Sequence, residues 1–130
     1  MTDAEMLTLV HKLEQCQLAN DAFHHRDHLA VAIVYLYAMD LPEAIEKMRS
    51  TLMRFAAHHD KAGLYHHTLT VFWATQVEGY IDRSLCLGDS AKRVFAQLND
   101  KDMVYQWYSK ERLFSPEARA SWVPSDRKPV

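Results

Sequence analysis

An almost wholly apolar run at residues 29–39 is the feature that most limits how this 130-residue chain can fold. The run is much shorter than the roughly 20 apolar residues of a transmembrane helix, so it predicts a buried core helix. Its apolar side chains would point in every direction around a helix axis, which is typical of the central element of a helical protein. His24, His25 and His28 stand at the start of this run.

The remainder of the chain favours helices over strands. It contains three glycines and no Asn-Gly or Asp-Gly pair, and its apolar residues recur at spacings of three and four. The sequence therefore predicts an all-α, single-domain antiparallel four-helix bundle over residues 1–123, with short C-terminal helices strapped across it and a polar tail at 124–130. The expected long helices run from Thr2 to near Asn20, from His24 or His25 to Met39, from Leu41 to near His58, and from about Leu64 to Arg83.

Composition limits the classes of partner. The net charge is -2, the pI is near 6.4, and no block of lysine or arginine occurs, so we expect no nucleic-acid partner and no membrane partner. The N-terminus carries acids where a signal peptide carries bases, which favours a cytoplasmic location. Cys16 and Cys86 fit no metal or disulfide framework and are expected to be free thiols.

The spacing of three histidines suggests a metal site. His25 and His28 are three residues apart, so they share one face of the predicted helix, and His66 shares a face with Thr70 and Trp73 on the fourth helix. Two chain reversals would make the second and fourth helices parallel, with their N-terminal ends together. Three imidazoles and one open position form the ligand set of a catalytic zinc ion, and imidazole also suits iron and nickel.

Other interpretations stay open beside the metal site. Tyr65 or Thr70 would lie in the second shell of a metal centre, or would instead hydrogen-bond imidazoles that are purely structural. The chain would then be a non-enzymatic module that binds a small ligand or a protein, and a homo-oligomer would also fit. Whether the protein is an enzyme is left undecided. The aromatic groove of such a module would be formed by Phe72, Trp73, Tyr105, Trp107 and Tyr108.

The C-terminal segment is mildly basic and has two interpretations. In the first, which we favour, it is a strap whose Leu113, Phe114 and Trp122 cover the bundle. In the second, Arg112 or Arg119 reaches over the histidines and holds a small anionic molecule, because guanidinium groups pair with carboxylate and phosphate.

The stretches FHHRDHL, RFAAHHDKAGLYHHTLT and YSKERLFSPEARASWV together resemble a family of small, uncharacterised bacterial proteins that are all-helical. Members share the frames F-x-H-x-x-H-L and Y-H-x-T-x-T, and the resemblance covers most of the chain from Phe23 to Val123. It implies a helical fold and a candidate pocket, and no reaction. The motif positions are occupied here by His25, His28, His66, Thr68 and Thr70.

Overall fold

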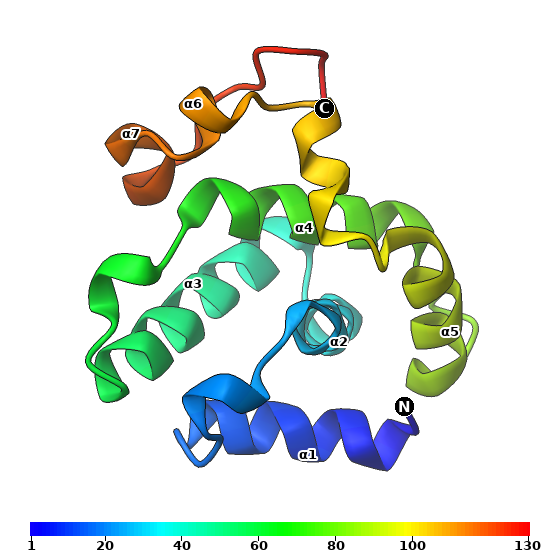
Figure 1. Ribbon diagram of the computed structural model, residues 1–130. Helices are drawn as coiled ribbons and strands as arrows, with labels where there is room; N and C mark the ends of the chain where they lie inside the picture. The colour runs from blue at the N-terminus through cyan, green and yellow to red at the C-terminus, as the bar shows by residue number, and fades with distance from the viewer.

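The computed structural model describes all 130 residues, and every regular element in it is a helix. Helix α2 (His25–Ala38) lies at the centre, and four helices pack around it (Figure 1). Leu29 to Ile33, Tyr35 and Leu36 are all buried in α2, which confirms the prediction of a central helix at the apolar run. The surrounding helices are α1 (Asp3–Glu14), α3 (Leu41–His58), α4 (His67–Tyr80) and α5 (Leu87–Leu98).

Shorter elements connect and extend these helices. They are η1 (Asn20–Ala22), η2 (Ala62–Leu64), η3 (Lys101–Gln106), α6 (Lys110–Leu113) and α7 (Pro116–Ala120). Helix α7 packs against α4 on the side away from α2 (Figure 1). No helix is both long enough and apolar enough to cross a lipid bilayer.

The arrangement is all-helical as predicted, but the four-helix bundle is not confirmed. Figure 1 views α2 along its axis while α1 and α4 lie across the view, so these helices cross α2 instead of running antiparallel to it. Helix α5, expected to be a short strap, contacts α2 as α1, α3 and α4 do. The molecule is better described as one buried helix enclosed by four others.

Local sequence explains where several helices begin. The Thr2 hydroxyl accepts the Glu5 backbone N–H at 3.1 Å, and the Glu5 carboxylate accepts the Thr2 backbone N–H at 3.1 Å, so the two residues form a capping box. Asp40 accepts the Glu43 N–H at 3.0 Å and starts α3 in the same way. These caps satisfy backbone N–H groups that a helix leaves free at its first turn.

Three predicted helix boundaries are wrong by several residues. Helix α1 ends at Glu14, well before Asn20, because Cys16 takes a left-handed backbone conformation with φ of 55°. Helix α4 begins at His67 instead of Leu64, because His66 is its N-cap, and it ends at Tyr80.

The C-terminal segment is fixed to the body by hydrogen bonds between residues far apart in sequence. The buried Tyr108 hydroxyl donates to the Val123 carbonyl at 2.6 Å, and the Thr68 hydroxyl donates to the Ser121 carbonyl at 3.0 Å. Leu113 is fully buried, as a strap requires, whereas Phe114 and Trp122 are about half exposed. The strap interpretation therefore fits Leu113 and not the two aromatic residues.

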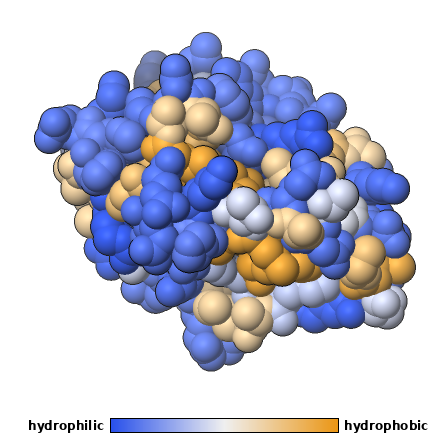
Figure 2. Space-filling model, turned by 90° about the horizontal axis from the view of Figure 1, so that it is seen from below, coloured by the Kyte–Doolittle hydropathy of each residue, from blue (hydrophilic) through white to orange (hydrophobic).

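The outer surface is mainly hydrophilic. Seen from the side of α1, hydrophobic residues form separate patches between hydrophilic ones (Figure 2). Leu7 of α1 is among the exposed apolar residues. Scattered apolar residues of this kind are normal on protein surfaces and do not by themselves mark a binding site.

Candidate ligand-binding pocket

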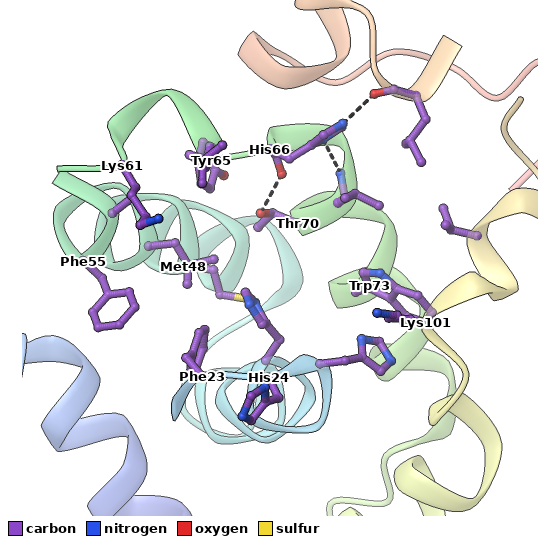
Figure 3. A pocket seen from close by; sticks show the side chains of 18 of the residues that line it. Phe23, His24, Met48, Phe55, Lys61, Tyr65, His66, Thr70, Trp73 and Lys101 are labelled. Carbon is purple, nitrogen blue, oxygen red and sulfur yellow. Dashed lines mark hydrogen bonds between the residues drawn. The ribbon is translucent and has the colours of Figure 1, made fainter. Parts of the chain in front are cut away.

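A cavity of about 570 Å³ lies between the N-terminal end of α2, α3 and the first turns of α4 (Figure 3). Of the 22 residues that line it, 13 are hydrophobic. Pockets for small organic ligands in proteins have about 300–1,000 Å³ and a mainly apolar lining, so the cavity has the size and character of such a pocket. Its aromatic lining residues are Phe23, Phe55, Tyr65, Trp73, Tyr105 and Phe114.

His66 lines the pocket with both ring nitrogens occupied by backbone groups. Nδ1 accepts the Leu69 N–H at 3.2 Å, so the ring proton is on Nε2, which donates to the Leu113 carbonyl at 2.5 Å. His66 thus caps α4 and ties it to α6, and burial lowers its pKa. Neither nitrogen is left with a free lone pair.

His25 is also held in place by the fold. Its Nε2 donates to the Leu98 carbonyl at 2.8 Å, which connects the start of α2 to the end of α5. Its ring meets the Trp73 ring edge-on, with 4.5 Å between centroids. Only Nδ1 of His25 remains without a protein partner.

His28 differs from both, because its ring forms no hydrogen bond within the chain. The ring lines the pocket and packs against Phe23, with 4.2 Å between centroids. Burial, together with the neighbouring His25, lowers the pKa of His28 to about 4. The imidazole is therefore neutral near pH 7.

The three histidines line one pocket, but they do not form a set of metal ligands. No group of three histidine, cysteine, aspartate or glutamate side chains is placed to hold a metal ion. His66 would have to release the Leu69 N–H before its Nδ1 could bind a metal. Helical spacing correctly brought His25 and His28 to one cavity, and it could not show that backbone groups already occupy two of the three rings.

The other predicted site residues divide into two groups. Tyr65, Thr70 and Trp73 line the pocket. Arg112 and Arg119 do not: Arg112 Nε donates to the Pro124 carbonyl at 3.1 Å, and Arg119 donates to the Leu64 carbonyl at 3.3 Å. These contacts hold the C-terminal segment. Arg119 nevertheless lies close enough to His66 for its positive charge to contribute, after burial, to the lowered pKa of that ring.

The aromatic groove predicted from sequence is split in the same way. Trp73 and Tyr105 line the pocket, whereas Phe72 is buried behind it against Trp107 and Tyr108. Ring centroids in this second cluster are 5.2 Å and 6.3 Å apart. The cluster is core packing that supports the wall formed by Trp73.

Several lining residues carry no signal in the sequence. Phe55 belongs to the apolar face of α3, and Lys61 and Lys101 sit in polar connections far apart in the chain. The one ion pair in the structure joins Arg83 to Glu78, so neither lysine is paired with a carboxylate. Figure 3 shows Lys61 and Lys101 on different sides of the pocket.

No family model, curated protein or solved structure matches this chain. The resemblance to small bacterial helical proteins therefore stays a prediction, and the pocket's own geometry carries the functional argument.

Proposed function

We propose that this protein binds a small, mainly apolar organic molecule in the cavity between α2, α3 and α4. The observation that carries the proposal is a cavity of about 570 Å³ whose lining is mostly hydrophobic and includes the imidazole of His28, which has no hydrogen-bond partner. Apolar walls with a few convergent polar groups are typical of small-molecule sites.

The edge of the pocket supports this proposal. Leu64 is 62% exposed and Phe114 is 47% exposed, and both line the cavity. Large apolar side chains that stay in water at the opening of a cavity lose that exposure when a ligand covers them, at about 25 cal/mol per Å² of apolar area buried. A ligand with an apolar body would therefore be stabilised at the opening as well as inside.

The metal-dependent alternative has weaker support. A three-histidine centre requires a free lone pair on His66, and both nitrogens of that ring contact backbone groups. Elemental analysis of protein purified without an affinity tag tests this alternative. Stoichiometric zinc, iron or nickel that disappears in His28→Ala would favour the metal centre over the proposal.

The direct test fills the cavity and measures binding of N-phenyl-1-naphthylamine, a neutral apolar probe whose fluorescence rises in apolar sites. Ala56 of α3 lines the pocket and is half-buried, while the adjacent Ala57 is exposed and lies outside it. We expect the intact protein to bind the probe saturably at one site. Ala56→Phe should weaken that binding about tenfold or more, because the new ring occupies ligand space.

Ala57→Phe is the matched control, with the same substitution one position along the same helix. It should bind the probe within about twofold of the original protein, since the change faces solvent. Circular dichroism and thermal unfolding verify that both variants fold. Probe binding that is absent, or that both substitutions weaken equally, would contradict the proposal.

A further inference from the structure

Several polar side chains of the pocket are held by hydrogen bonds within the protein, and His28 is not. Tyr65 donates to His67 Nδ1 at 2.8 Å, and Thr70 donates to the His66 carbonyl at 3.1 Å. His66 has two backbone partners and His25 has one. His28 alone among these inner polar groups has no hydrogen-bond partner in the chain.

A neutral imidazole has one nitrogen that donates and one that accepts. The low pKa of His28, about 4, keeps it in this neutral form near pH 7. The ring nitrogens of His28 are not sealed from solvent, because no fully buried side-chain nitrogen or oxygen lacks a partner. A ligand that closes the pocket removes their contact with water and must replace it with a hydrogen bond. The accepting nitrogen is best matched by an O–H group, which is a strong donor without being charged.

The surroundings of His28 favour a flat, aromatic ligand body. The Phe23 ring lies against His28, and the Phe55 ring meets Phe23 edge-on with 5.7 Å between centroids. Trp73 also lines the pocket, and its ring meets the His25 ring edge-on. Aromatic rings gain free energy from edge and offset contacts with other rings, beyond the area they bury.

Charge at the pocket argues against a cationic ligand. Lys61 and Lys101 both line the cavity without a paired carboxylate, and Asp102 is the one acidic residue in the lining. A ligand amine would face two ammonium groups and one carboxylate. A neutral ligand avoids this repulsion and also avoids moving a charge into an apolar cavity.

We propose that His28 recognises a hydroxyl group on a neutral aromatic ligand by accepting a hydrogen bond from it. The ligand class is therefore a phenol or a related hydroxylated aromatic compound. This inference depends on the proposed function, because it assigns chemistry to a ligand in the same pocket. His28 is the specificity-determining residue. The aromatic walls supply the part of the affinity that does not depend on the ligand's hydroxyl group.

The experiment compares 2-naphthol with 2-methoxynaphthalene, which has the same ring system but no O–H group. Binding of each probe is measured by calorimetry, or by displacement of N-phenyl-1-naphthylamine, at pH 7.5. The original protein should prefer 2-naphthol by about tenfold. In His28→Phe that preference should disappear, while the affinity for 2-methoxynaphthalene stays within about twofold.

Two further variants isolate the role of the ring nitrogen. His28→Gln should keep part of the preference, since an amide oxygen also accepts an O–H hydrogen bond. His11→Gln changes an exposed imidazole on α1 that does not line the pocket, and it should leave the preference unchanged. If His28→Phe does not fold, His28→Leu makes the same comparison.

The inference is overturned by a preference below about twofold in the original protein, or by one that survives in His28→Phe. Tighter binding of 2-naphthoate than of 2-naphthol, unaffected by His28→Phe, would overturn it in favour of an anionic ligand held by the lysines. In each of these cases saturable N-phenyl-1-naphthylamine binding still supports the pocket. Loss of all probe binding instead contradicts the proposed function itself.

Discussion

At the C-terminal end of α2, Tyr37 places its hydroxyl 2.7 Å from Ser90 Oγ, 2.7 Å from the Asp82 carbonyl and 2.9 Å from the Leu85 carbonyl. At the N-terminal end of the same helix, His28 faces a cavity and has no hydrogen-bond partner. The two ends therefore differ. At the C-terminal end the polar atoms form hydrogen bonds within the protein, whereas the N-terminal end borders a cavity and has an imidazole without a hydrogen bond.

Tyr35, one turn before the end of α2, shows the same structural use of a polar group. Its hydroxyl donates to Glu14 at 3.0 Å and lies 3.1 Å from Thr51 Oγ1, joining α1, α2 and α3. Burial raises the pKa of Tyr35, so the hydroxyl stays protonated. Polar residues at this end fix the positions of helices, whereas the unpaired imidazole at the other end is available to a ligand. Whether a polar side chain has a hydrogen-bond partner within the chain distinguishes a structural role from a ligand-binding role better than its residue type does.

Ile33 lies in the middle of α2 and supports both ends, so its truncation should have the largest effect. The side chain is fully buried, and Ile33→Ala should lower the free energy of unfolding by about 2–5 kcal/mol through lost burial and a residual cavity. Urea denaturation followed by circular dichroism measures the change. The control is Leu7→Ala, at a residue 53% exposed, which should stay within about 0.5 kcal/mol. Equal effects at both positions would contradict a central role for α2.

The pH dependence of stability should report the burial of His28. Its pKa is about 4 in the folded protein and near 6.5 when exposed, so between these values the unfolded chain binds more protons. Stability should therefore fall as the pH is lowered from 6.5 towards 4, and the contribution of His28 should reach about 2 kcal/mol between pH 7.5 and pH 5. Above pH 7 this contribution should be flat.

Urea denaturation of His28→Gln at pH 7.5 and pH 5 measures this contribution directly, because glutamine does not titrate. The variant should lose less stability on acidification than the original protein. His11→Gln, at an exposed position on α1, is the control. It should lose as much stability between pH 7.5 and pH 5 as the original protein does. If His28→Gln and the original protein lose stability equally, the pKa of His28 is not lowered in the folded protein.

Local sequence was enough to predict the central helix and the starts of α1 and α3. The apolar run at 29–39 has no polar face, so only a central position could bury it. The caps at Thr2 and Asp40 depend on residues three positions apart, which sequence reading detects directly. The same spacing placed His25 and His28 on one face of α2, and both line the pocket. His66 also lines it, but its position there was predicted from parallel second and fourth helices, whereas α4 crosses α2 (Figure 1).

Contacts between distant residues could not be predicted in this way. Gly88 approaches the N-terminus so closely that a Cβ there would lie 3.0 Å from the Met1 carbonyl oxygen, and its N–H donates to Asp3 at 2.8 Å. This contact helps α5 to pack as a full member of the fold. Likewise, the Leu113 carbonyl that occupies His66 follows it by 47 residues. The periodicity of apolar residues indicates which face of a helix a side chain is on. It does not indicate which distant segment of the chain will contact that side chain.

Ser90 provides the smallest and most specific test of the paired end of α2. Ser90 is fully buried, and its Oγ accepts the Asp82 N–H at 3.0 Å and lies 2.7 Å from the Tyr37 hydroxyl. Ser90→Ala leaves the Asp82 N–H without this partner, while Tyr37 keeps its carbonyl contacts, so stability should fall by about 1 kcal/mol. The control is Ser84→Ala, which removes an exposed hydroxyl in the same connection.

Because the pocket is at the other end of the helix, N-phenyl-1-naphthylamine affinity should stay within about twofold in Ser90→Ala. A larger loss of affinity would mean that the two ends of α2 are energetically coupled.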